Sequence, residues 1–178
     1  MIINPKKLVR QRLEIRAFLE KIVIDAGVGR LGQQPSFEEK ALPQISRDIA
    51  MITGQKPQIR RAKKSIAGFK LREGQIVGLR VTLRKAKMVD FFERLITIVL
   101  PRVRDFSGLD ATMVDNGGVL NVGVREHVVF PEISPDQSPV SFSIGISMVP
   151  KMKNRAHSLE EFKRLGVPIK KEKTKKKK

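Results

Sequence analysis

The sequence predicts an α+β fold, in which an antiparallel sheet has helices packed on one face as a two-layer sandwich, followed by a disordered basic tail. Segments that alternate apolar and polar residues are interleaved with segments of helical periodicity. Two extended runs joined by a polar tip with Gly74 are typical of an antiparallel hairpin. Of the 178 residues, 40% are apolar, which is enough for one core. We therefore predict a single domain over residues 1–169 and a lysine-rich tail over 170–178.

The elements follow from these periodicities in chain order. They are predicted as a helix over Lys7–Arg16 beginning near Pro5, a strand over Lys21–Ala26, a helix over Phe37–Thr53, extended runs over Gln58–Ala62, Ile66–Leu71 and Ile76–Arg84, a helix over Lys87–Leu100, strands over Val119–Val129 and Val140–Val149, and a short helix from Ser158 to Leu165. The hairpin is expected between Ile66–Leu71 and Ile76–Arg84, with the tip over residues 72–75.

The second and last helices have recognisable start signals. Ser36 and Glu39 form a capping box before the second helix, and Gly54 stops it. Ser158 and Glu161 have the same spacing at the start of the last helix. We expect Ser36 and Ser158 to be the N-caps.

Prolines and apolar stripes define the rest. Pro43 lies where it would bend the second helix, and Pro101 ends the third. Phe91 and Phe92 belong to the broad stripe of the third helix, so they are assigned to the core and not to a binding site. The strand over Val140–Val149 alternates apolar residues with serine and glycine, which indicates burial of one face only.

Charge is concentrated in Lys56–Lys87, which has eleven Lys and Arg residues and one acid, Glu73, so that it contributes +10 of the net +18. Such a segment within foldable sequence favours an RNA-binding face over a solvated surface without a partner. An anionic membrane is the weaker alternative, because the chain has no long amphipathic Lys/Phe helix, no membrane-length apolar run and no secretory signal.

Aromatic composition argues against single-stranded RNA stacked on exposed rings. The chain has no Trp or Tyr, and its nine aromatic residues are all Phe, which is more often buried. The absence of Cys excludes disulfides and thiolate chemistry and fits a reducing compartment.

The glycines in Gly27–Gly32 have the spacing of a dinucleotide-binding fingerprint. Three residues separate the last glycine from the expected N-cap Ser36, so no helix opens at once onto a pyrophosphate. A glycine turn that lets one backbone approach another is the better interpretation. A nucleotide-dependent enzyme stays open as an alternative that rests on these glycines alone.

Other catalytic or metal-binding patterns are missing from the sequence. His127 and His157 lie thirty residues apart without a second ligand at metal spacing. Ser65 lies beside Lys64, but no third group orients them for nucleophilic catalysis. We predict no enzyme activity, no cofactor and no metal.

Several motifs in order resemble the large-ribosomal-subunit protein five family of bacterial type. They are AKKSIAGFKLREG at 62–74, GLRVTLR at 78–84, FFERLI at 91–96, RVRDFSG at 102–108, and GVRE at 123–126 with FPEI at 130–133. The resemblance spans about residues 20–165 and implies an α+β sandwich. It also implies a structural role in translation: binding 5S rRNA and large-subunit rRNA in the central protuberance beside neighbouring proteins, contacting the P-site tRNA, and bridging to small-subunit protein thirteen.

The resemblance also assigns residues to these partners. The 5S rRNA-binding residues would be Asp25, Gly27, Gly29, Arg30, Gln55, Lys56, Arg60, Arg61, Lys63, Lys64 and Ser65. The tRNA-facing loop would be Arg72, Glu73, Gly74 and Gln75, and the intersubunit loops Leu109–Gly118 and Glu132–Pro139. Asp25 stands where the family pattern has Asn, and Arg60 where it has Thr. A cytoplasmic ribosome is expected, with an organellar ribosome and a free-standing RNA chaperone or assembly factor as alternatives.

Overall fold

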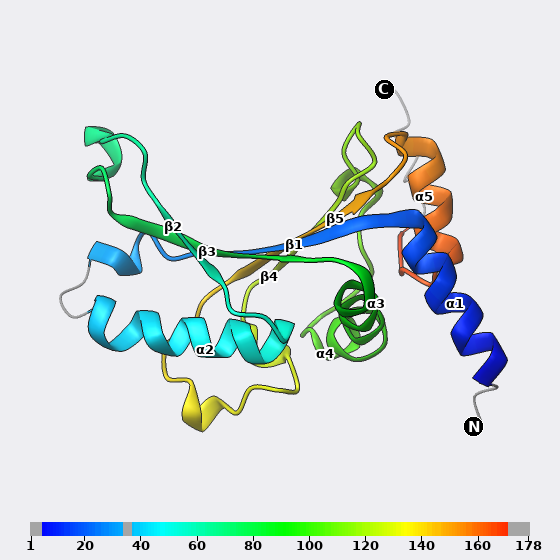
Figure 1. The fold of residues 1–178 in the computed structure, drawn as a ribbon, viewed down its shortest axis with the longest axis horizontal. Coiled ribbons are helices and arrows are strands. Elements are labelled where there is room, and N and C mark those ends of the chain that lie inside the picture. Colours follow the sequence, from blue (N-terminus) through cyan, green and yellow to red (C-terminus); the bar gives the residue numbers. More distant parts are fainter. Residues whose placement is uncertain (1–4, 34–36, 171–178) are drawn as a thin grey trace. The chain divides into compact units, whose positions relative to one another are not determined.

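The computed structural model describes residues 5–33 and 37–170. Five strands form one open antiparallel sheet in the order β2–β3–β1–β5–β4 (Figure 1). The strands are β1 (Leu19–Gly27), β2 (Gln58–Arg61), β3 (Ile76–Leu83), β4 (Leu120–Val124) and β5 (Ile144–Pro150). The helices are α1 (Pro5–Phe18), α2 (Leu42–Thr53), α3 (Lys85–Arg94), α4 (Leu100–Arg102) and α5 (Arg155–Arg164). The predicted α+β class is confirmed.

The chain divides into two compact units, each built from segments that are not contiguous in the sequence. Unit 1 comprises residues 1–22, 84–122 and 147–178, and unit 2 comprises 23–83 and 123–146. The single domain predicted over residues 1–169 stays a prediction. The predicted cap Ser36 and tail residues 171–178 lie outside the described residues.

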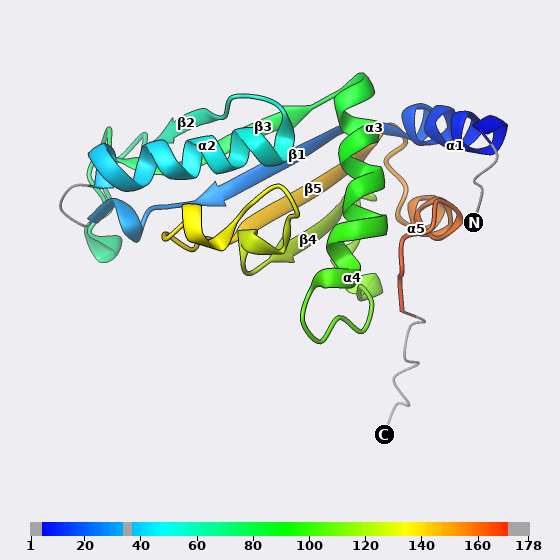
Figure 2. The ribbon, with the colours of Figure 1, turned by 90° about the horizontal axis from the view of Figure 1, so that it is seen from below.

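In unit 2, helix α2 packs against strand β3 (Figures 1 and 2). The predicted stripe of the helix is buried at Ile45, Ile49 and Ile52. On β3 the alternating residues Leu79 and Val81 are buried as well. Because side chains alternate along a strand, the residues between them point to the other face of the sheet. Arg80 therefore projects from the face of β3 that lies away from α2.

Two wider π turns occur shortly before prolines. Phe37–Ala41 precedes Pro43, and Leu95–Val99 precedes Pro101. Proline has no amide hydrogen, so the carbonyl four residues earlier loses its usual donor, and the helix widens locally. Pro43 lies in the first turn of α2 and not inside a longer α-helix, so the predicted bend stays a prediction. Pro101 does not end its helix as predicted, because α4 continues through Arg102.

The predicted hairpin is wrong in its first strand. Strand β3 pairs antiparallel with Gln58–Arg61 and not with Ile66–Leu71. Residues 66–71 instead fold back on themselves, with an isolated bridge between Ile66 and Leu71 around a 3-10 turn. The backbone groups of this segment bond to one another, so they cannot extend the sheet.

Further boundaries differ from the sequence prediction, including that of strand β5, which begins at Ile144 and not at Val140. Strand β4 ends at Val124 and not at Val129, because a 3-10 turn begins at His127. Helix α5 is capped by Asn154, whose side-chain oxygen accepts the His157 amide at 3.2 Å, and not by Ser158. Ser158 is buried inside the helix. Asn154, about one turn upstream of Ser158, caps a free amide of the first turn, so the serine spacing was a coincidence.

Candidate RNA-binding surface

The open face of the sheet in unit 2 presents arginines from two adjacent strands. Residues directly opposite each other in an antiparallel pair share a face. Gln58 lies opposite Arg80, and Arg60 lies opposite Gly78, while Ile59 lies opposite Leu79. Since Leu79 is on the buried side, Arg60 and Arg80 share the face away from α2. The predicted cationic face is thus formed by β2 and β3.

Arg80 forms an ion pair with Asp25 on the same sheet. Its Nε donates to Asp25 Oδ1 at 2.5 Å, and both side chains are about 40% exposed, at 42% for Arg80 and 40% for Asp25. The hydrogen bond and charge of Asp25 raise the pKa of Arg80. The carboxylate of Asp25 is therefore matched by a neighbouring cation, which explains how an anion is accommodated on this face.

The loop after β1 approaches β3 closely. The Val28 amide donates to the Val77 carbonyl at 3.0 Å, and the Gly32 amide donates to Val28. A Cβ on Gly32 would lie 3.1 Å from the Ile76 carbonyl oxygen. The glycine turn therefore lets two backbones meet, as predicted from the sequence, and it ends in a 3-10 turn over Leu31–Gln33.

Gly27 and Gly29 differ from Gly32, because the protein itself does not require them to be small. A Cβ on Gly27 would meet no atom within 4 Å, and on Gly29 only the Val77 carbonyl oxygen at 3.8 Å. Both predicted site residues leave free space beside the exposed Arg30. This space is compatible with close approach by a partner.

The first part of the predicted basic segment, around β2, has exposed cations. Strand β2 and the residues on either side of it include the exposed cations Lys56, Arg60, Arg61, Lys63 and Lys64. Within the described residues, no acidic group forms an ion pair with any of these five. Their charges therefore remain available to an external anion.

Some predicted site residues also hold the loop together. The Arg61 Nη1 donates to the Gly74 carbonyl at 2.9 Å. The Ser65 hydroxyl accepts the Glu73 amide at 2.9 Å. Gln55 is exposed just after α2, and its backbone carbonyl accepts a hydrogen bond from the Thr53 hydroxyl at 3.0 Å.

Residues 72–75 form a tight turn within the loop between β2 and β3, which projects from the sheet (Figure 1). The Gln75 amide donates to the Arg72 carbonyl at 3.2 Å, and Gly74 has φ +80°. A positive φ at the third residue is typical of a type II turn, where glycine is strongly preferred. Arg72 and Glu73 are exposed at this tip. The predicted turn is confirmed, although it joins β3 to a compact loop and not to a second long strand.

Sequence reasoning missed an exposed aromatic residue in this loop. Phe69 is 76% exposed, whereas Phe91 and Phe92 are buried as predicted. The prediction that the Phe residues are buried is therefore wrong for Phe69. Phe69 lies between Gly68 and Lys70, and an aromatic residue flanked by a glycine and a cation is the local signal that could have identified it.

A second polar cluster in unit 2 is buried and is not an active site. Ser138 Oγ donates to Asp48 Oδ2 at 2.5 Å and lies 2.7 Å from both His127 Nε2 and Gln44 Nε2. In a hydrolase triad the histidine lies between serine and acid, but here the serine lies between them. His127 is 0% exposed and Asp48 2%, so substrate has no access.

The bonding in this cluster fixes the state of His127. The one hydroxyl hydrogen of Ser138 goes to Asp48, so Ser138 accepts from both Gln44 and His127, which places a hydrogen on Nε2. Burial lowers the pKa of His127, while the charge of Asp48 opposes this. The ring also stacks on Phe142, with centroids 4.1 Å apart. The cluster fastens the 127–142 segment to α2.

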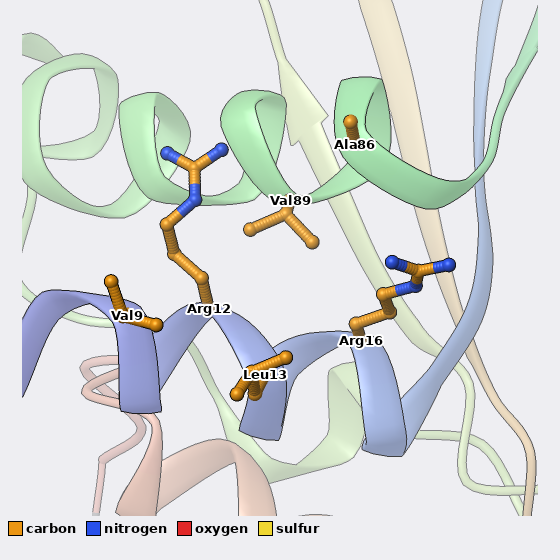
Figure 3. Close-up of a pocket in the computed structure, with 6 residues that line it drawn as sticks. All are labelled: Val9, Arg12, Leu13, Arg16, Ala86 and Val89. Atoms are coloured by element: carbon orange, nitrogen blue, oxygen red, sulfur yellow. The ribbon is translucent and has the colours of Figure 1, made fainter.

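Unit 1 has an apolar groove between α1 and α3 that contains no predicted site residue. It measures about 250 Å³ and is lined by Val9, Arg12, Leu13, Arg16, Ala86 and Val89 (Figure 3). Arg12 reaches from α1 towards α3, where it pairs with Asp90 and, at 3.0 Å, with Glu93. Burial raises the pKa of Glu93, and the charge of Arg12 opposes that rise. The arginine joins the two helices.

Neither a metal cluster nor a membrane helix is found in the described part of the chain. Over residues 5–33 and 37–170, no three His, Cys, Asp or Glu side chains gather as a metal site requires. Within the same ranges, no helix combines the length and hydrophobicity needed to cross a membrane.

Comparison with known proteins identifies relatives over most of the chain. Residues 16–72 match the family model for ribosomal protein L5, and residues 76–169 match the ribosomal L5P family C-terminus. The chain is 46% identical over 153 residues to large ribosomal subunit protein uL5 of Chlorobaculum tepidum, covering 86% of this chain and 81% of the relative.

Two other bacteria have similar proteins of the same name. Identity is 45% over 153 residues with the Fusobacterium nucleatum protein, covering 86% of this chain and 81% of that one. It is 42% over 151 residues with the Halothermothrix orenii protein, covering 85% and 82%. The resemblance noted from the sequence motifs is confirmed. The chain belongs to the ribosomal protein L5 family, whose members are non-enzymatic structural constituents of the large ribosomal subunit in translation.

Proposed function

We propose that this protein binds 5S rRNA in the central protuberance through the cationic surface of unit 2. The observation that carries the proposal is the run of exposed cations at Lys56, Arg60, Arg61, Lys63 and Lys64, none of which is ion-paired within the described residues. Such charges bind phosphates and release counterions, which gives affinity without catalysis. The bacterial relatives support a cytoplasmic ribosome as its location.

Further contacts of the protein follow from its family. The tip formed by Arg72–Gln75 contacts the P-site tRNA, and the loops Leu109–Gly118 and Glu132–Pro139 contact small-subunit protein thirteen. The remaining partners are large-subunit rRNA and neighbouring proteins of the central protuberance. Supporting the tRNA contact, the tip is exposed and held in shape by its own backbone hydrogen bonds.

A double substitution tests the 5S rRNA contact. Lys63→Ala with Lys64→Ala removes two exposed charges, so 5S rRNA binding should weaken and the slope of log affinity against log salt should flatten by up to about two units. The matched control is Lys153→Ala with Lys163→Ala, which removes two exposed lysines from unit 1. An unchanged slope in the first variant, or equal flattening in both, would contradict this surface.

The structural role is tested separately by sedimentation of cell extract. A constituent of the subunit should be found mostly on mature large subunits. Recovery mostly away from them would favour an assembly factor.

A further inference from the structure

A cavity in unit 2 lies between the loop after β1 and the loop between β2 and β3. It measures about 650 Å³, within the roughly 300–1,000 Å³ range of small-molecule sites. It is lined by Gly29, Arg30, Gly68, Phe69, Lys70, Leu71 and Val77. The fold thus brings Arg30 to the same cavity as a segment about forty residues later in the chain.

Phe69 is the distinctive residue of this cavity. Its side chain is 76% exposed, although burying a Phe side chain would stabilise the fold by roughly 1.5–3 kcal/mol. An aromatic ring held at the surface among cations is the usual platform for a nucleobase. The exposure therefore points to an external ligand with a flat apolar face.

The turn that presents Phe69 is fixed by its own backbone. The Phe69 amide donates to the Ile66 carbonyl at 3.2 Å, and the Lys70 amide to the Ala67 carbonyl at 2.9 Å. Lys70 adopts the left-handed conformation with φ +50°, which a residue with a side chain rarely does. Strained backbone of this kind is often found where a ligand is bound. The ring is therefore preorganised.

Two glycines leave the wall of the cavity bare without serving the fold. A Cβ added to Gly68 would meet no atom within 4 Å, and one on Gly29 only the Val77 carbonyl oxygen at 3.8 Å. Neither glycine has a φ in the left-handed region. The protein's packing and backbone would accept a side chain at both positions. Their missing side chains leave room for something outside the chain.

The remaining lining matches a nucleotide. Leu71 and Val77 supply apolar surface, while Arg30 and Lys70 supply two positive charges. We propose that this cavity receives one unpaired nucleotide of a structured RNA, with its base on Phe69 and its phosphate near Arg30 and Lys70. The inference rests on the RNA-binding function proposed above and adds a pocket for a single base to a surface that otherwise contacts phosphates.

Binding of the full-length protein to purified 5S rRNA and, separately, to deacylated tRNA tests the proposal. Phe69→Leu keeps an apolar side chain but removes the ring, and should weaken binding roughly 5- to 150-fold, the equivalent of about 1–3 kcal/mol per stacked base. Stacking is uncharged, so the salt slope should not change. Phe69→Trp should bind at least as tightly as the wild type. Ile66→Ala, an exposed apolar residue of the same loop, is the matched control and should bind normally.

A second variant tests the room in the cavity. Gly68→Leu should weaken binding while leaving the thermal midpoint within the range of surface substitutions, because the added side chain meets no protein atom at its Cβ. Weakening by Phe69→Leu with 5S rRNA or with tRNA identifies which RNA supplies the base. Wild-type affinity of Phe69→Leu for both RNAs, or normal binding by Gly68→Leu, would overturn the pocket. Failure of the wild-type protein to bind 5S rRNA would instead overturn the proposed function.

Discussion

Replacing Ser138 by alanine tests how unit 2 is held together. The hydroxyl donates to Asp48 at 2.5 Å and accepts from His127 and Gln44, each at 2.7 Å. Alanine removes all three bonds and leaves the buried carboxylate of Asp48 with the Gln44 amide at 3.2 Å. Water cannot replace the lost donor easily, because Asp48 is 2% exposed.

The magnitude follows from the kind of bond lost. A hydrogen bond to a charged group contributes about 1.5–3 kcal/mol and each of the two neutral ones about 1 kcal/mol, so Ser138→Ala should destabilise the protein by about 3.5–5 kcal/mol. The cluster bonds the segment containing Ser138 to α2, so the loss should also speed amide exchange there.

Urea unfolding at neutral pH measures the effect. Ser141→Ala, an exposed serine three residues later, is the matched control and should stay within about 0.5 kcal/mol of the wild type. A loss below about 1 kcal/mol for Ser138→Ala would refute the reasoning, since it would mean that Asp48 finds another donor or becomes protonated without penalty.

Three further outcomes are expected. Burial lowers the pKa of His127 from its ordinary 6.5, so the unfolded chain takes up this proton at a higher pH than the folded protein does. The free energy of unfolding should therefore fall as the pH drops below about 6.5, by up to about 1.4 kcal/mol per pH unit. In urea unfolding, His127→Gln should flatten this dependence on pH. Gly78→Ala places a Cβ 2.9 Å from the Ala26 carbonyl oxygen and should cost about 1–3 kcal/mol, whereas Gly27→Ala meets no atom and should leave the thermal midpoint nearly unchanged; similar midpoints would contradict the close approach. Asn154→Ala removes the cap of α5 and should destabilise unit 1 by about 1 kcal/mol in calorimetry, with no loss indicating another cap.

Local periodicity was sufficient to predict those elements whose buried residues recur at a regular spacing along the chain. Ile22 and Ile24 alternate with more exposed residues in β1, and Ile45 and Ile49 recur at helical spacing in α2, so both elements were predicted. Strand pairing depends on residues far apart in the chain. Ile66–Leu71 has strand-forming composition, but β3 pairs with Gln58–Arg61, and nothing in the local pattern distinguishes the two candidates.

The candidate site was predicted by residue type and not by arrangement. The exposed lysines were identified from charge density, but the partner of Asp25 was not, because Arg80 lies 55 residues away in the sequence. Likewise, the approach of His127 Nε2 to Asp48 Oδ2 at 3.6 Å joins residues far apart in the sequence. Phe69 was missed because an average preference for burial says nothing about one particular ring.

The place of β2 at the end of the sheet has a consequence for the newly made chain. A strand at a sheet border has unpaired backbone groups that can recruit another molecule's strand and start aggregation. Here the border strand is only four residues long, its register shifts between Arg60 and Arg61, and all four side chains are exposed. Like charges on two such strands repel each other, so the arginines that would meet RNA phosphates also keep copies of the protein apart before any RNA is present.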